Sequence, residues 1–217
     1  AEVAISGTRK EALDAIAAEM KERVHVLPCN LADKDAVEAL VPSADKAMGQ
    51  VDILVNNAGI TKDNIFVRLS DEAWDQVIAV NLTAPFLLSQ AAIPHLLETD
   101  GAIVNVTSSA ALIGEAYFAA YCASKAGLVN LTKALAMEYS RKPIRINAVA
   151  PGGMVTNIAS SMVFPEGAEI DLVQRFSGLR GQVEVDDVAE LILMLASPAG
   201  RSYHGACLSI DAGITAG

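Results

Sequence analysis

The chain has 217 residues, of which 52% are hydrophobic and 19% are charged, and its formal net charge is −10. This length allows one domain with a full core and is short for two ordinary ones, so we expect a single domain over residues 1–217. The acidic balance argues against nucleic acid and anionic membranes as partners, because both select for basic surface.

Short apolar runs alternate with segments of helical periodicity along the whole chain. The pattern predicts strands at residues 3–6, 24–27, 51–55, 103–106, 144–149 and 206–210. It predicts helices at residues 10–21, 33–48, 83–97, 121–139 and 185–195, and one more helix that begins after a Ser70 cap. Repeated strand–helix alternation is typical of a doubly wound α/β fold whose parallel sheet is covered on both faces.

The cysteines Cys29, Cys122 and Cys207 are an odd, unclustered set without metal-ligand spacing. We therefore expect free thiols in a reducing cytoplasm and no metal site. No run approaches the roughly 18 apolar residues of a membrane span, and no signal peptide opens the chain, so we expect a cytoplasmic protein without a membrane partner.

Tyr121 and Lys125 lie four residues apart in a predicted helix, so their side chains share one face. A phenol has an unperturbed pKa of about 10, and a fixed cation beside it moves that pKa toward the range of a general acid-base. Ser108, just after the predicted strand 103–106, could hold a carbonyl or alcohol oxygen. On its own, however, the Tyr-x-x-x-Lys spacing also fits two ordinary surface residues.

Further motifs accompany this pair in a fixed order: Asn-Asn-Ala-Gly at 56–59, Asn81 between apolar residues, and Pro-Gly-Gly-Met-Val-Thr at 151–156. At these spacings, the sequence resembles the short-chain dehydrogenase/reductase family over essentially its whole length. Its first 80 or so residues look most like bacterial 3-oxoacyl-(acyl-carrier-protein) reductases.

The resemblance implies a Rossmann-like fold and an NAD(P)-dependent oxidoreductase that interconverts a ketone and a secondary alcohol. In that family pattern Tyr121 is the general acid-base, Lys125 lowers the pKa of Tyr121 and binds the nicotinamide ribose, and Ser108 orients the substrate oxygen. Ser109 is a rival by adjacency, but the family spacing selects Ser108. Asn81 would hold a backbone and water relay to Lys125; the alternative is a helix-interior asparagine that faces solvent.

The resemblance also implies cofactor contacts in the loops that follow the strands, where small residues let the backbone approach a ligand. Besides Tyr121 and Lys125, the expected cofactor residues are Thr8, Arg9, Asn30, Leu31, Asn57, Ala58, Gly59, Pro151, Gly152, Met154 and Thr156. For Asn30, a simple turn-forming role is the alternative.

Arg9 favours NADP(H) over NAD(H) as the cofactor. NAD-selective members carry an acidic residue at the end of this strand, where Gly7 stands here, and no carboxylate follows before Glu11. A guanidinium can pair with a 2′-phosphate through its fork of donors. The alternative is a solvated arginine that opens a helix.

Residues 155–180 are expected to cover the substrate. Their apolar members suggest a hydrophobic substrate portion, although simple packing explains them equally well; they include Met162, Val163, Phe164, Pro165 and Phe176.

An acyl carrier protein is acidic and needs a basic docking surface. The loop at 97–101, basic in the resembled reductases, reads Leu-Glu-Thr-Asp-Gly here, which leaves Arg141 and Lys142 nearby. Acyl-thioester substrates and small ketones or alcohols without a carrier therefore both remain open.

The sequence begins at the position of the family's second strand. The first strand, its Gly-rich phosphate-binding turn and the first helix, roughly 30 residues, are absent from it. Because that strand is central in this architecture, we expect strands 3–6 and 51–55 each to lack one partner. We favour omission from the sequence over a non-catalytic structural or ligand-sensing protein, because every later motif is intact.

Members of this family commonly pair the Tyr-Lys helix across a two-fold axis, so we expect a homotetramer. Residues 121–139 are apolar on more than one side, and residues 210–214 could add a second contact. The alternative is a helix that is buried wholly within its own subunit.

Overall fold

The computed structural model describes residues 1–20, 23–160, 162, 164–178 and 180–216. The predicted helix end at Lys21 and the expected cover residue Val163 lie outside this part. Within it, the strands match the predicted runs to within two residues at either end: β1 Val3–Ile5, β2 Val24–Val26, β3 Ile53–Asn56, β4 Ala102–Val106, β5 Arg145–Pro151 and β6 Cys207–Ile210.

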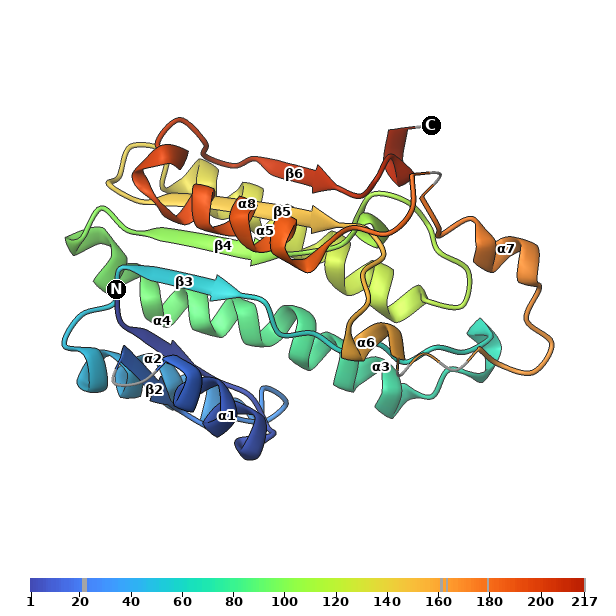
Figure 1. Cartoon of the computed structure of the whole chain (residues 1–217), viewed down its shortest axis with the longest axis horizontal. Helices are drawn as coiled ribbons and strands as arrows, with labels where there is room; N and C mark the ends of the chain where they lie inside the picture. The colour runs from blue at the N-terminus through green and yellow to red at the C-terminus, as the bar shows by residue number, and fades with distance from the viewer. Residues whose placement is uncertain (21–22, 161, 163, 179, 217) are drawn as a thin grey trace.

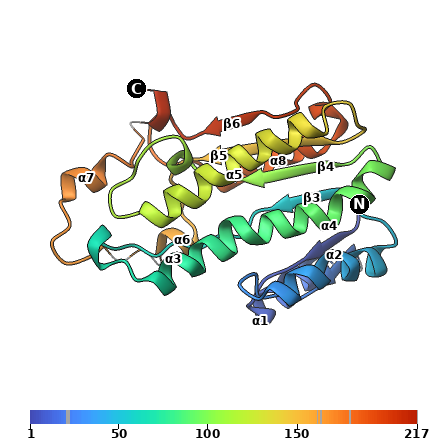
Figure 2. The ribbon, with the colours of Figure 1, turned by 180° about the vertical axis from the view of Figure 1, so that it is seen from behind.

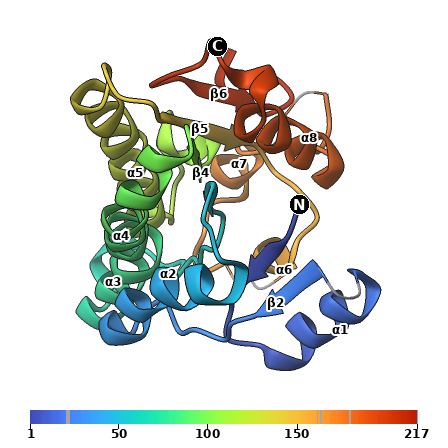
Figure 3. The ribbon, with the colours of Figure 1, turned by 90° about the vertical axis from the view of Figure 1, so that its left-hand side faces the viewer.

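Every ladder between these strands is parallel, as the strand–helix alternation predicted. One sheet has the order β3-β4-β5-β6, and β1 pairs separately with β2, in the register Val3 to Val24. Figure 3 shows the β1–β2 layer with α1 and α2 at the bottom and the larger sheet above it. The fold is the expected α/β class with a parallel sheet.

β1 and β3 each have one strand partner in the described part of the chain, as expected from the sequence. Apolar side chains on both are exposed: Val3 by 38%, Ile53 by 46% and Val55 by 40%. Valine and isoleucine in parallel strands are ordinarily buried on both faces. These two strands are therefore only partly covered here.

Helices cover both faces of the larger sheet. The helices have the bounds α1 Lys10–Met20, α2 Lys34–Met48, α3 Asp71–Ile78, α4 Ala84–Glu98, α5 Ala119–Glu138, α6 Asn157–Ser160, α7 Ile170–Gln174 and α8 Val185–Ala196. α8 lies in front of β4 and β5 in Figure 1, and α4 and α5 lie on the opposite face, in front in Figure 2. Asp33 caps α2, and the predicted cap Ser70 accepts a hydrogen bond from the Ala73 amide at 3.2 Å.

β4 supplies side chains to the core on both faces of the sheet, because successive strand residues point to opposite sides. Ile103 packs in the cluster that includes Leu96 of α4 and Ile146 of β5. Val104 packs in the other cluster, with Leu195 of α8. This doubly covered strand leads directly to Ser108.

α3 and α4 are joined by a π-helical turn at Ala79–Thr83, so that one helix runs from Asp71 to Glu98. This helix is long and apolar enough to cross a membrane by length and composition, which corrects the expectation that no segment reaches that size. Half of its most apolar window is buried within the fold, and α4 packs against α2, β3 and β4. It is therefore accounted for as a core helix.

Candidate active site

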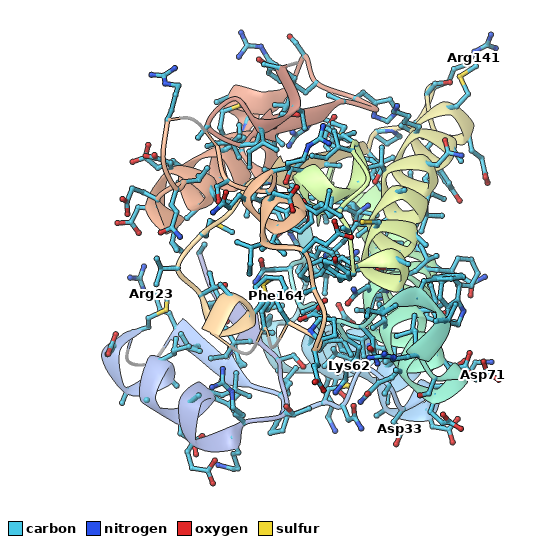
Figure 4. All side chains as sticks on the ribbon, turned by 90° about the vertical axis from the view of Figure 1, so that its right-hand side faces the viewer. Arg23, Asp33, Lys62, Asp71, Arg141 and Phe164 are labelled. Carbon is cyan, nitrogen blue, oxygen red and sulfur yellow. The ribbon has the colours of Figure 1, made fainter. Side chains whose placement is uncertain are left out.

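The expected site residues gather at the carboxyl ends of the strands, the edge where open α/β sheets bind ligands. The arrowheads of β3 to β6 point to this edge at the right of Figure 1, and Figure 4 looks onto it. Thr8 and Arg9 follow β1, Asn30 and Leu31 follow β2, Asn57 to Gly59 follow β3, Ser108 follows β4, and Pro151 to Thr156 end and follow β5.

Ser108 and Tyr121 lie near each other at this edge, as the family resemblance implied. Ser108 has extended backbone after β4, and its Oγ accepts a hydrogen bond from the Ala110 amide at 3.2 Å, which caps the short 3₁₀ turn. Tyr121 lies in the first turn of α5, and its phenol is close enough to the Ser108 hydroxyl for that side chain to lower the pKa of Tyr121. Two hydroxyls are thus available to one substrate oxygen.

Lys125 is only 3% exposed, although it carries an ammonium group. Its Nζ donates to the Val106 carbonyl oxygen at 2.9 Å and lies over the Tyr121 ring, 5.7 Å from the ring centroid. Burial lowers the pKa of Lys125 to about 8. An ammonium has three donors, so this group can donate to a ligand as well as to Val106.

The expected lowering of the Tyr121 pKa is wrong for this structure. Burial of the phenol raises the pKa of Tyr121 to about 12, the hydrogen bond from Ser108 offsets part of that rise, and the charge of Glu115 adds to it. Desolvation of the phenolate exceeds any help from Lys125, whose own charge is disfavoured by burial.

Asn81 is fully buried, so the interpretation of a solvent-facing asparagine is wrong. Its Nδ2 donates to the Ile60 carbonyl at 2.9 Å and to Ser124 Oγ at 3.1 Å, and its Oδ1 accepts from the Ile60 amide at 2.9 Å. The π-helical turn around Asn81 is a feature that often marks functional sites. Its relay to Lys125 remains a prediction.

The residues at this edge fit a nucleotide cofactor. A Cβ on Gly59 would lie 3.3 Å from Lys125 Nζ and 3.5 Å from Asn81 Oδ1, so the small residue leaves room beside both groups. Asn57, Ala58, Thr8 and Arg9 are exposed there. A ligand can therefore approach the backbone of both loops.

Other expected cofactor residues have structural contacts of their own. Asn30 Oδ1 accepts from the Ala32 amide at 3.1 Å, in line with its turn-forming alternative. Met154 packs its side chain against the apolar cluster of Val183 and Leu195, which leaves its backbone for a cofactor contact. A Cβ on Gly152 would lie 2.7 Å from the Asp211 Cα, so that glycine permits a close chain crossing.

Glu115 is a site residue that the sequence reading missed. It is half-buried in the loop before α5, and the nearby Ser109 side chain opposes part of the rise in its pKa. Burial raises its pKa to about 7, and its charge raises the pKa of Tyr121. A single glutamate in a loop is ordinarily expected to face solvent. The apolar residues Ile113 and Phe118 nearby could have indicated that it is partly buried.

A chain of buried polar side chains links α5 to the sheet, and it was not predicted from the sequence. Asn56 Nδ2 of β3 donates to Asn105 Oδ1 of β4 at 2.8 Å, and Asn105 Nδ2 donates to Thr132 Oγ1 of α5 at 2.8 Å. Thr132 Oγ1 donates in turn to the Leu128 carbonyl. Amides inside apolar strands imply such partners, because buried polar groups are almost always paired.

Comparison with known proteins places the chain in a family. The family model described as enoyl-(acyl carrier protein) reductase matches residues 1–215. Nodulation protein G of Rhizobium sp. (strain N33) is 37% identical over 213 residues, which are 98% of this chain and 86% of that protein. The 3-oxoacyl-(acyl-carrier-protein) reductase of Thermotoga maritima is 37% identical over 210 residues, 94% of this chain and 84% of that protein.

Solved structures agree with this result. The 3-ketoacyl-(acyl-carrier-protein) reductase of Brucella melitensis, complexed with NADH, superposes with a TM-score of 0.89 at 30% identity, over 99% of this chain and 88% of that one. A dehydrogenase/reductase of Sinorhizobium meliloti 1021 superposes with a TM-score of 0.87 at 32% identity, over 98% and 84% of the two chains. The chain therefore belongs to the short-chain dehydrogenase/reductase family and is an NAD(P)-dependent oxidoreductase with a Rossmann-like fold.

Proposed function

We propose that the protein uses NADP(H) to interconvert a ketone and a secondary alcohol. The observation that carries this proposal is the position of the buried Lys125 ammonium over the ring of Tyr121, with the Ser108 hydroxyl close enough to act on the same phenol. It sets a proton donor and a second hydroxyl at the sheet edge where a substrate oxygen can be held between them.

The proton chemistry follows from these side chains. Ser108 donates a hydrogen bond to the substrate oxygen, and Tyr121 transfers its phenolic proton to that oxygen as it gains negative charge. With a pKa of about 12, Tyr121 is protonated at neutral pH and is ready as the acid for reduction. The hydride for the carbonyl carbon would come from a nicotinamide cofactor held by the loops at this edge. Lys125 binds the nicotinamide ribose of the cofactor, and Asn81 orients the backbone and water that lead to Lys125.

The preference for NADP(H) is supported by Arg9. Its side chain is exposed just after β1, and its carbonyl accepts the Ala12 and Leu13 amides that open α1. A guanidinium at this position suits a 2′-phosphate, and Gly7 offers no carboxylate for a 2′-hydroxyl.

Two substrate classes deserve testing. The names of several relatives favour 3-oxoacyl thioesters. Arg141 and Lys142, however, lie beyond the far end of α5 from Tyr121, and this helix of 20 residues is about 30 Å long. They therefore lie far from Tyr121 of the same subunit, and this distance supports substrates without a carrier as the second candidate.

The deciding experiment measures NADPH oxidation with one 3-oxoacyl group carried on acyl carrier protein and on N-acetylcysteamine, and with small ketones. Turnover of any of these ketones supports the reaction class. A higher kcat/KM for the carrier-bound substrate supports the first substrate class, and no gain supports the second. Absence of turnover with every ketone and of oxidation with the matching alcohols would reject the proposal.

A further inference from the structure

Two neighbouring residues join the segment between β5 and α8 to the start of the catalytic helix. The Tyr117 hydroxyl accepts a hydrogen bond from the Glu169 amide, just before α7, at 2.8 Å. The Tyr117 carbonyl accepts a second hydrogen bond from the Asn64 amide at 3.1 Å. Tyr117 therefore connects two loops at the carboxyl edge of the sheet.

Phe118 provides apolar contacts at the same place. We call Tyr117, Phe118 and the residues that they contact the junction. Phe118 is 1% exposed at the N-cap of α5. Its ring lies 6.2 Å from the ring of Phe164 at 76°, and 5.6 Å from the ring of Phe176 at 87°. Edge-to-face pairs of this kind are favourable beyond simple burial. Because Phe164 precedes α7 and Phe176 follows it, α7 is held from both ends.

The backbone of Tyr117 is strained at this point. Its φ of 73° lies in the left-handed region, which is an outlier for a bulky side chain. Such conformations persist where surrounding contacts determine them, and they cluster at functional sites. The hydrogen bond to Glu169 and the burial of Phe118 are the contacts that supply this constraint.

The junction stands next to the proposed reaction centre. Phe118 and Tyr121 are three residues apart at the start of α5, so their side chains are neighbours. Phe164 is 38% exposed on the face that Figure 4 shows, so part of its ring remains available to another molecule. Through Phe118, the apolar surface of Phe164 is thus held at the end of α5 that carries Tyr121.

We propose that Tyr117 and Phe118 are specificity-determining positioning residues, which hold Phe164 as an apolar wall for the carbon chain of the ketone. The inference deepens the proposed ketone reduction and depends on it. The wall selects substrates with an extended apolar substituent, whereas the reacting carbonyl is held by Ser108 and Tyr121 whatever the chain length.

The test compares N-acetylcysteamine thioesters of 3-oxobutanoic and 3-oxodecanoic acid with NADPH. Tyr117→Phe removes the acceptor of the Glu169 amide and keeps the ring, so KM for the longer substrate should rise about three- to tenfold. Phe164→Ala should raise the same KM by about tenfold or more. For Tyr117→Phe, kcat and the KM of the short substrate should stay near wild type. For Phe164→Ala, the KM of the long substrate should rise several-fold more than the KM of the short one. Tyr203→Phe, a half-exposed tyrosine before β6, is the matched control and should change neither KM.

A second measurement, limited trypsin cleavage, tests the contacts of Tyr117 without depending on catalysis. Arg175 is exposed directly after α7, and trypsin cleavage after it should be faster in Tyr117→Phe than in wild type or Tyr203→Phe. Equal losses for short and long substrates, or unchanged cleavage, would overturn the inference while leaving the reduction intact. A wild-type protein that reduces neither thioester and no other ketone would instead refute the proposed function, and the inference with it.

Discussion

The ammonium of Lys125 lies over the ring of Tyr121, 5.7 Å from its centroid, and donates to the Val106 carbonyl at 2.9 Å. Burial acts on both groups in the direction of the neutral form, because it raises the pKa of Tyr121 to about 12 and lowers that of Lys125 to about 8. Tyr121 is therefore protonated at neutral pH and can donate its phenolic proton to a substrate oxygen.

Tyr121→Phe should remove the proton donor and leave the fold and the cofactor surface intact. We expect turnover to fall by at least about 100-fold, which is the usual contribution of a positioned general acid. NADPH affinity, measured by fluorescence titration, should change by less than about twofold, well under the tenfold that 1.4 kcal/mol represents. Wild-type turnover in this variant would show that another group delivers the proton.

Arg9→Ala should reduce NADPH affinity more than NADH affinity. The loss of a charge-assisted contact to the 2′-phosphate should cost roughly 1.5–3 kcal/mol for NADPH and little for NADH. Arg23→Ala is the control, because Arg23 is also exposed but precedes β2, at the opposite edge of the sheet. Equal losses for both cofactors in Arg9→Ala would contradict the role.

Glu115 should make the stability of the protein depend on pH. Its pKa is raised from 4.5 to about 7 in the folded state, so the folded protein binds more protons between these values. The stabilisation of the folded state is fully present below the unfolded-state pKa of 4.5, and it is lost as the pH rises through the folded-state pKa of about 7. In Glu115→Gln this fall in unfolding free energy, at most about 3 kcal/mol, should be absent from denaturant titrations.

The same substitution should also change the reaction profile. The charge of Glu115 raises the pKa of Tyr121, so Glu115→Gln should lower that pKa. Alcohol oxidation needs the phenolate, and its rise with pH should therefore occur at lower pH in the variant. A profile identical to wild type would mean that Glu115 does not act on Tyr121.

The sequence predicted the strands and most helices because apolar runs and helical periodicity are local signals. Tyr121 and Lys125 were found because residues four apart share one face of a helix, and Ser108 was found because the family resemblance selects it over Ser109. The contacts of Asn81 with Ile60 and Ser124 were not predicted from the residues, since a π-helical turn redirects one side chain and leaves no mark in a 3.6-residue period. The positive φ of Tyr117 was equally hidden, because it depends on contacts with residues 64 and 169, distant in sequence.

Thr132→Val should destabilise the protein by about 1–3 kcal/mol, because it leaves the Asn105 amide without its buried acceptor. Thr83→Val serves as the control, since Thr83 is exposed. Chemical denaturation of both variants measures the difference. Equal stability of the two would mean that Asn105 finds another partner when Thr132 is changed.

We expect a homotetramer, and the burial of α5 shows how much of its apolar surface is free for contact between subunits. Leu128, Val129 and Ala136 of this helix are buried within the subunit, so they take part in its own core. Ala123 and Ala126 remain exposed. Much of the apolar surface that suggested assembly is therefore used internally, and the remaining contact depends on a smaller set of side chains.

Met137 of α5 is 76% exposed and Phe86 of α4 is 45% exposed, on helices that lie side by side over one face of the sheet in Figure 2. Burial of these apolar side chains against a second copy, in a closed symmetric arrangement, would remove both from water. Light scattering at micromolar concentration should give the mass of a tetramer for the wild type. The double variant Phe86→Asp and Met137→Asp should give a smaller mass with an unchanged circular dichroism spectrum, because a desolvated carboxylate opposes association. A monomer mass for the wild type would reject the assembly, and a tetramer mass for the double variant would place the interface on another surface.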